Sequence, residues 1–275
     1  MSARFSSLVP IRPFGSAPPL FFIHGVGGVV PDYGNLLDKL DPAHPVYGIR
    51  SQAFDSAAPA LTSLEEIAAY HLREIRRILP RGPYCFIGFS FGGMVAYEMA
   101  QQLLEQDEKA PFIGMIDSCE MSYMTRMLKQ DSPGKKATEI SRRLKLRFSE
   151  AFQRPDTFAY VKEKIMSRTM RLLYSVFSGF GVAIPGRLQN AYHVNWFAAV
   201  NYVPKPYNGH IALFKAKDHF WDRRIPPDLG WAPLVREGIE MFEIPGSHVS
   251  LFLEPNVSVL GKCLASCLEA ISQTA

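Results

Sequence analysis

Residues 84–104 read YCFIGFSFGGMVAYEMAQQLL, and this stretch decides the fold. The apolar run from Tyr84 to Gly88 predicts a strand that is buried on both faces, and Phe91 to Leu104 predicts a helix directly after it. Between them lies the pattern G-x-S-x-G, which is typical of a sharp turn that pushes the side chain of Ser90 out of the backbone. Such a turn needs small residues two positions before and after the serine, and both positions hold glycine. We therefore predict a nucleophilic serine here, in preference to an ordinary glycine-rich turn.

The same alternation of strands and helices continues on both sides of this turn. Helices are predicted at 63–79, with Ser63 as cap and Pro80 as stop, around 233–237, and at 256–271. Strands that alternate with helices are typical of a parallel sheet with helices on its faces. Short apolar runs predict the remaining strands at 20–23, 46–49, 112–116, 210–215 and 239–244.

The alternation stops between about residues 120 and 207. Basic helical segments with Met and aromatic residues replace the short strands there. A chain of 275 residues suits one large α/β domain with an insertion better than two independent domains. We therefore predict a single domain over 1–275, with a core of about 1–119 and 208–275 and an insertion of about 120–207.

Composition and charge exclude several classes of function. The net charge of +4 is too small to predict nucleic-acid binding. The four cysteines form no C-x-x-C pair and predict neither a disulfide framework nor a metal site. No apolar run is long enough to span a membrane, and the N-terminal residues lack the apolar core of a signal peptide. The sequence therefore predicts a cytoplasmic protein without a membrane or nucleic-acid partner.

A serine nucleophile needs a histidine base that a carboxylate holds in place. In a fold with this turn the histidine follows the last strand. Of the seven histidines only His248 does so, in a loop that Pro245 and Gly246 introduce. The acid is either Asp117, after the strand 112–116, or Asp218, after the strand 210–215, since both fit the chain order Ser, Asp, His. The residues alone leave this choice open.

The negative oxygen that forms during acyl transfer needs backbone N–H donors. One donor belongs to Phe91, directly after the serine, and the candidate for the second is Val26, in the loop after the strand 20–23. The alternative for residues 24–28 is a phosphate-binding glycine turn, but they lack the Lys and Ser or Thr of a P-loop and the spacing of a dinucleotide fingerprint. His24 is predicted to brace this loop, not to transfer a proton.

Six stretches of the chain carry a family resemblance: residues 18–25, 88–100, 116–118, 207–214, 230–231 and 245–252. They resemble the thioesterase domains that terminate nonribosomal peptide and polyketide synthases, the enzymes of secondary-metabolite biosynthesis. The resemblance implies an α/β-hydrolase fold with a mostly parallel sheet, places the acid at Asp117, and makes the insertion at 120–207 a helical lid. Ser247 departs from the family, in which Asp is common before the histidine.

The resemblance also implies a substrate and a partner. The substrate is an acyl or peptidyl chain that a carrier protein domain holds as a thioester on its phosphopantetheine arm, and the protein binds no cofactor or metal of its own. Release passes through an acyl-Ser90 intermediate and ends in hydrolysis or cyclisation. Two other functions stay open: a carboxylesterase or lipase-like hydrolase of small esters, and a hydrolase-fold binding module without catalysis.

The predicted lid is strongly basic. Residues 120–171 contain 13 Lys and Arg and 6 Asp and Glu, a net charge of +7 in a chain whose total is +4. A solvated helical face is the commoner explanation of such a charge run. The functional alternative is that this face attracts an acidic carrier domain and steers its thioester arm towards Ser90. The apolar inner face of the lid is then predicted to come from Met121, Met124, Met127, Phe148, Phe152, Met166, Leu172 and Leu173.

Overall fold

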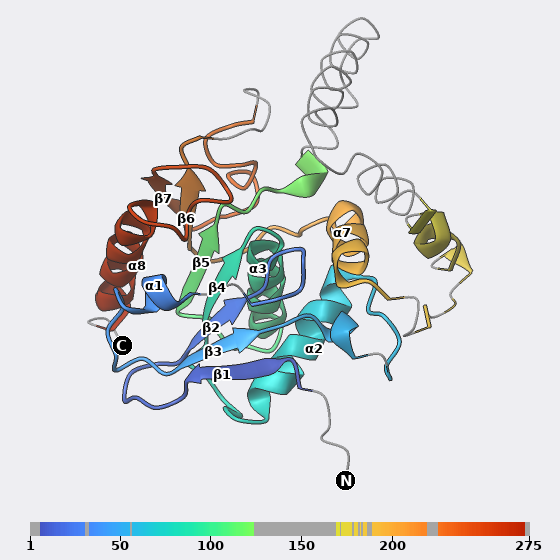
Figure 1. The fold of residues 1–275 in the computed structure, drawn as a ribbon, viewed down its shortest axis with the longest axis horizontal. Coiled ribbons are helices and arrows are strands. Elements are labelled where there is room, and N and C mark those ends of the chain that lie inside the picture. Colours follow the sequence, from blue (N-terminus) through green and yellow to red (C-terminus); the bar gives the residue numbers. More distant parts are fainter. Residues whose placement is uncertain are drawn as a thin grey trace, which may run out of the picture.

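The computed structural model describes residues 6–30, 33–55, 57–123, 169–170, 172–177, 179–180, 182, 184–185, 189–218 and 225–272. Its centre is a seven-stranded sheet (Figure 1). The strands are β1 (Leu8–Arg12), β2 (Leu20–Ile23), β3 (Val46–Ile49), β4 (Cys85–Phe89), β5 (Phe112–Ile116), β6 (Ile211–Ala216) and β7 (Ile239–Ile244). Their order is β1-β3-β2-β4-β5-β6-β7, and every neighbouring pair is parallel except β1 with β3.

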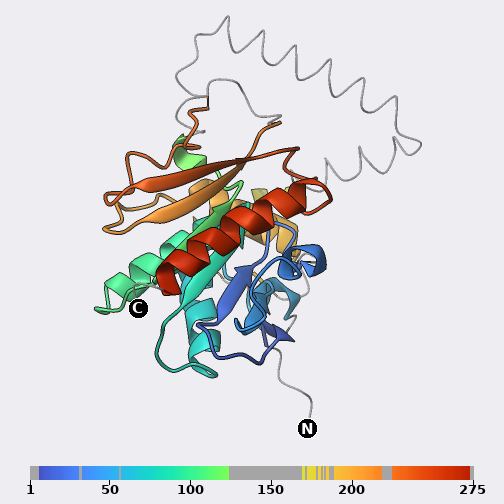
Figure 2. The same cartoon turned by 90° about the vertical axis from the view of Figure 1, so that its left-hand side faces the viewer.

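Helices cover both faces of this sheet. They are α1 (Gly34–Leu37), the short 3-10 helix η1 (Gln52–Phe54), α2 (Leu64–Arg76), α3 (Phe91–Leu104), α7 (Ala191–Asn201) and α8 (Asn256–Ser272). Helices α2, α3 and α7 pack together on one face, and α1 packs with α8 on the other, where α8 runs across the sheet (Figures 1 and 2).

The alternation of side chains along β2 shows how the sheet fills both layers. Phe21 and Ile23 belong to the apolar cluster beneath α2 and α3, whereas Leu20 and Phe22 belong to the cluster beneath α1 and α8. All four side chains are fully buried. Because successive residues of a strand point to opposite faces, a strand covered on both sides must be apolar throughout. This explains the continuous apolar runs in the sequence.

The structure confirms the predicted mostly parallel sheet with helices on both faces. Strands β2, β3, β5 and β7 and helix α3 have the predicted bounds. Helix α2 begins as predicted, with Ser63 Oγ accepting a hydrogen bond from the Glu66 N–H at 3.1 Å. It ends at Arg76, three residues before the expected end at Leu79.

One predicted helix is wrong. Residues around 233–237 form turns, not a helix. Their backbone groups bond instead to the segment before β6: the Tyr207 N–H donates to the Leu234 carbonyl at 2.7 Å, and the Glu237 N–H donates to the Gly209 carbonyl at 3.1 Å. The Leu234 and Val235 N–H groups still donate to the Trp231 carbonyl and form one turn. The next two N–H groups, of Arg236 and Glu237, donate to residues 207 and 209, so the helical hydrogen-bond pattern cannot continue.

Part of the predicted insertion is described. Helix α7 lies within 120–207 and packs against α2, α3 and η1. Residues 124–168, which carry most of the basic side chains of the predicted lid, lie outside the described residues. None of the described helices has the length and apolar character needed to cross a membrane.

Candidate active site

Ser90 stands at the carboxyl end of β4, directly before α3, in a strained backbone conformation. Its φ of 55° and ψ of −117° are rare for any residue with a Cβ. Such a conformation costs on the order of 1–3 kcal/mol and persists only where its surroundings enforce it. The Ser90 N–H donates to the carbonyl of Ile116 on the adjacent strand β5 at 2.8 Å, which anchors the turn to the sheet.

The two glycines of the motif allow this turn because the backbone passes very close to them. A Cβ added at Gly88 would lie 2.1 Å from the carbonyl oxygen of Gly92. A Cβ added at Gly92 would lie 2.5 Å from the carbonyl oxygen of Ile23 at the end of β2. Only hydrogen fits at either position, so the requirement for small residues around Ser90 is confirmed.

The structure brings His248 and Asp117 together. Their Nδ1 and Oδ2 atoms are 2.6 Å apart, and the Asp117 side chain is fully buried. The other carboxylate oxygen of Asp117 accepts a hydrogen bond from the Ala216 N–H at 3.0 Å. An ionised carboxylate only accepts hydrogen bonds, so the proton lies on Nδ1 of the imidazole and leaves Nε2 free to act as a base.

Aromatic stacking sets the position of the His248 ring. The ring lies over that of Phe89, the residue before the serine, with centroids 4.6 Å apart and planes 26° apart. Among the described residues the Ser90 hydroxyl has no hydrogen-bond partner, and no bond joins it to His248. Catalytic hydrogen bonds are often long in enzymes without substrate and tighten when it binds.

In the described part of the chain, no hydrogen bond or ion pair joins His248 to the alternative acid, Asp218. Its side chain is exposed just after β6. Its N–H donates to the carbonyl of Gly246 at 2.9 Å, which ties the end of β6 to the loop that carries His248. Asp218 therefore contributes its backbone to the architecture of this loop, while Asp117 contributes its carboxylate to the histidine.

A small cavity of about 60 Å³ opens beside Ser90. The two predicted oxyanion donors, Val26 and Phe91, line it together with Ser90 and Asp117. Phe91 is the first residue of α3, where backbone N–H groups have no partner within the helix. The rest of the lining is mostly apolar and comes from α3, from the segment after β5 and from α7: Met94, Cys119, Met121, Trp196 and Ala199.

His24 lies fully buried beneath the loop that carries Val26. Its Nδ1 is 2.7 Å from the carbonyl oxygen of Gly25, and its ring stacks on that of Phe91 with centroids 5.7 Å apart. Burial lowers the pKa of His24 to about 4. Burial and the nearby His24 ring also lower the pKa of His71, whose ring centroid lies 5.8 Å from that of His24. Both rings are therefore neutral at pH 7, which suits a bracing role and not proton transfer.

These buried rings predict a loss of stability in acid. The unfolded chain takes up a proton on His24 near pH 6.5, whereas the folded chain resists it down to about pH 4. Between these values the unfolded state binds more protons, so the free energy of unfolding falls as the pH drops through this window, by up to about 3 kcal/mol for His24.

Urea denaturation of the wild type and of His24→Gln at pH 7, 5.5 and 4 measures this effect. We expect the variant to lose less stability on acidification than the wild type, with part of the slope left to His71. His210→Gln, a change at an exposed histidine at the other end of the sheet, should leave the slope unchanged. An equal slope in wild type and His24→Gln would contradict the prediction.

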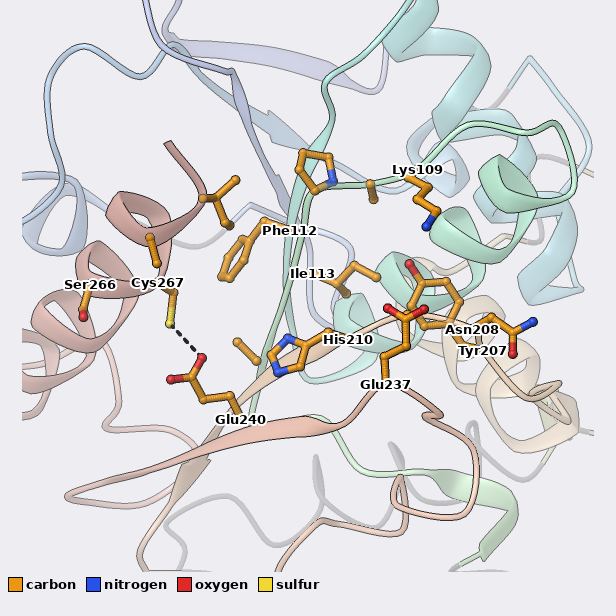
Figure 3. Close-up of a pocket in the computed structure, with 16 residues that line it drawn as sticks. Lys109, Phe112, Ile113, Tyr207, Asn208, His210, Glu237, Glu240, Ser266 and Cys267 are labelled. Carbon is orange, nitrogen blue, oxygen red and sulfur yellow. Dashed lines mark hydrogen bonds between the residues drawn. The ribbon is translucent and has the colours of Figure 1, made fainter. Parts of the chain in front are cut away.

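A larger cavity, of about 480 Å³, lies at the opposite end of the strands from Ser90, where the strands begin (Figure 3). Lys109, Phe112, His210, Glu237 and Cys267 are among the residues that line it, where β5, β6 and β7 begin. Burial raises the pKa of the Cys267 thiol to about 12, so this sulfur is not an activated nucleophile. The cavity beside Ser90 is therefore the better candidate for the active site, although it is smaller.

A comparison with known protein families identifies the family of this chain. A family described as "Thioesterase domain" matches residues 18–267. The chain belongs to this thioesterase family. Among the described residues, no three His, Cys, Asp or Glu side chains gather as a metal site would require.

Relatives of this thioesterase domain are parts of large synthetases. It is 27% identical over 268 residues to malpibaldin synthetase of Mortierella alpina and 28% identical over 272 residues to a dimodular nonribosomal peptide synthase of Bacillus subtilis (strain 168). Each match covers 97% of this chain but only 4% and 11% of the two relatives. The chain thus corresponds to a small part of each of these proteins.

The structural comparison agrees on the fold. The NocB thioesterase domain, solved as a covalent complex with a fluorophosphonate nocardicin G analog, matches with a TM-score of 0.65 and 19% identity, over 96% of this chain and 100% of that chain. Together with the parallel sheet described above, this match confirms the predicted α/β-hydrolase fold of the thioesterase domain.

Proposed function

We propose that this thioesterase domain releases an acyl or peptidyl chain from the phosphopantetheine arm of a carrier protein domain, through an acyl-Ser90 intermediate. The observation that carries the proposal is the 2.6 Å contact between His248 and Asp117, with the His248 ring stacked beside the strained turn of Ser90. A serine on such a turn and a histidine in the tautomer of a base are what acyl transfer requires.

The first half of the reaction forms the acyl-enzyme. Nε2 of His248 takes the proton of Ser90 as its oxygen attacks the thioester carbonyl, and Asp117 stabilises the charged ring. The N–H groups of Phe91 and Val26 hold the tetrahedral oxyanion. When the intermediate collapses, the carbon–sulfur bond breaks and the departing thiolate receives the proton from His248.

The second half frees the product. A water molecule, or a hydroxyl or amine of the bound chain, loses a proton to His248 and attacks the acyl-Ser90 carbonyl. The bond between the acyl carbon and Ser90 Oγ then breaks, and Oγ takes the proton from His248, so the same groups serve hydrolysis and cyclisation. The apolar lining beside Ser90 suits an acyl group without charge at its reacting end. In this proposal residues 1–275 form one domain, and the net positive charge of residues 120–171 attracts an acidic carrier domain.

The test compares two activated acyl donors with the same acyl group. The purified domain is incubated with an acyl-phosphopantetheine thioester or with the matching nitrophenyl ester, and intact-protein mass spectrometry and turnover are measured for both. We expect an acyl adduct that maps to Ser90 and a higher kcat/KM for the thioester. A strong preference for the nitrophenyl ester would favour a carboxylesterase, and failure of a fluorophosphonate to label Ser90 would favour a binding module.

A further inference from the structure

A buried amide connects α7 to the loop that carries Val26. Asn195 lies in the middle of α7 with only 1% of its surface exposed. Its Nδ2 donates to the carbonyl oxygen of Val26 at 3.0 Å, and its Oδ1 accepts from Ser51 Oγ at 3.3 Å. Both ends of the amide are used, and neither bond lies within α7. Asn195 therefore contributes to the contact between α7 and its surroundings more than to the helix itself.

The loop around Val26 is held from its other side by separate contacts. The carbonyl of Gly25 accepts from the Gly28 N–H at 3.0 Å and lies 2.7 Å from Nδ1 of His24. This carbonyl belongs to the same planar peptide unit as the Val26 N–H, so these contacts fix one side of Val26. The Val26 carbonyl belongs to the next peptide unit. The bond from Asn195 fixes the orientation of this second peptide unit. The contacts on the two peptide units together fix the backbone dihedral angles of Val26.

One face of α7 serves this site. Ala191, Asn195 and Ala199 are four residues apart and therefore lie above one another on the helix. A Cβ added at Gly28 would lie 2.7 Å from the Cβ of Ala191, so the helix and the loop are in close contact. Ala199 lines the cavity beside Ser90 together with Val26. Asn195 stands between these two contacts, and its amide supplies the polar link between α7 and the loop.

We propose that Asn195 is a positioning residue, which aims the Val26 N–H at the oxyanion by holding the Val26 carbonyl from α7. The proposal rests on the proposed function, because it assumes that Val26 donates to the oxyanion. Asn195 does not touch the substrate in this proposal and acts only through Val26. The position of α7 therefore controls the rate of acyl transfer more than the affinity for the substrate.

Two substitutions separate this role from packing. Asn195→Asp keeps the size of the side chain and the acceptor for Ser51, but it removes the donor and turns an oxygen towards the Val26 carbonyl. Asn195→Leu keeps a similar volume and removes both hydrogen bonds. Loss of one oxyanion donor costs about 100- to 1000-fold in kcat, so a loosened donor is expected to cost roughly 10- to 100-fold, with KM nearly unchanged.

The matched control is Asn201→Asp. Asn201 ends the same helix, and its Nδ2 also donates to a backbone carbonyl, that of Phe197, at 2.8 Å. Its side chain is exposed and its bond stays within α7. This variant should therefore keep the wild-type kcat. Ser51→Ala removes the hydrogen bond to Oδ1 of Asn195, together with the one that Ser51 Oγ accepts from the Ala53 N–H at 3.2 Å, and should also lower kcat, by a smaller factor.

The measurement counts only enzyme that is folded. Active sites are titrated with a fluorophosphonate. The value of kcat is then expressed per labelled Ser90, and KM is measured in the same assay. The inhibition constant of an alkylboronic acid is measured in parallel, since the Ser90 oxygen adds to boron and gives a tetrahedral anion that occupies the oxyanion position. We expect this constant to rise by the same factor by which kcat/KM falls in the Asn195 variants. A packing defect alone lowers the melting temperature and the number of labelled sites, not these two quantities.

The result that overturns the proposal is a wild-type kcat per labelled site and a wild-type boronate affinity in Asn195→Leu and Ser51→Ala. That result leaves the thioesterase proposal intact, because Ser90 is still labelled and still turns over substrate. Failure of the thioesterase proposal has a different signature, in which the wild type itself does not acylate Ser90. Should Asn195→Asp not fold, Asn195→Leu and Ser51→Ala decide the question.

Discussion

Replacement of Ser90 by alanine is expected to lower kcat by about a million-fold, the typical loss when the nucleophile of such a triad is removed. The fold should survive, because the glycines at 88 and 92 that permit the turn are unchanged and the Ser90 N–H keeps its bond to the Ile116 carbonyl. Single-turnover kinetics with an acyl thioester give the rate, and urea denaturation gives the free energy of unfolding. Labelling by a fluorophosphonate should disappear.

Ser118 provides the control for this experiment. Its hydroxyl is buried one residue after Asp117 and has no hydrogen-bond partner among the described residues. Ser118→Ala thus removes a buried hydroxyl near the site without breaking a described hydrogen bond, and activity and labelling should stay near the wild-type level. Near-normal turnover by a well-folded Ser90→Ala protein would contradict the whole mechanism.

Replacement of Asp117 by asparagine is expected to lower kcat by about four orders of magnitude, by analogy with a triad aspartate whose loss leaves the histidine in the wrong tautomer. An asparagine amide can donate to Nδ1 of His248, which would place the ring proton on Nε2 and remove the base that the proposed mechanism requires. The variant changes one atom of a buried side chain, so its volume is conserved. The decisive measurement is kcat at neutral pH per folded enzyme, with the folded fraction taken from urea denaturation.

The contrast with Asp218→Asn makes this prediction specific. The Asp218 side chain is exposed, and its described link to the His248 loop is through the backbone N–H, which the substitution leaves in place. Its kcat should stay within a small factor of the wild type. If the two effects were reversed, the acid would belong to the strand β6 and not to β5.

The sequence predicted the sheet and the turn at Ser90 because both depend on local patterns. Such patterns need only residues that are neighbours in the sequence: the four consecutive buried residues of β2 and the two glycines around Ser90 are examples. The choice between Asp117 and Asp218 was open because it depends on which strand lies next to β4. That adjacency is a property of the sheet order and does not show in the local spacing.

Three other features depended on contacts between distant segments. The turns around 233–237 replace the predicted helix because residues 207–209 use the same backbone groups. The bond between Asn195 and Val26 joins positions 169 residues apart. The one local signal for it was a polar amide in the apolar stretch of α7, and a buried amide needs partners wherever it lies. The stacking of Phe89 on His248 likewise requires the last loop of the chain to return to β4.

The order of the strands also bears on how such a domain can change. The proposed nucleophile Ser90, the proposed oxyanion donor Phe91 and the proposed acid Asp117 all lie between residues 90 and 117, at the ends of two adjacent strands and on the helix between them. The segment predicted as an insertion begins only after Asp117, so its length and composition can vary without separating the acid from the serine. If the acid had instead followed β6, the predicted insertion at 120–207 would lie between the serine and the acid in the chain. In the proposed mechanism, a change in this segment would therefore leave Ser90, Phe91 and Asp117 on one continuous stretch of chain, and only His248 would come from beyond the segment.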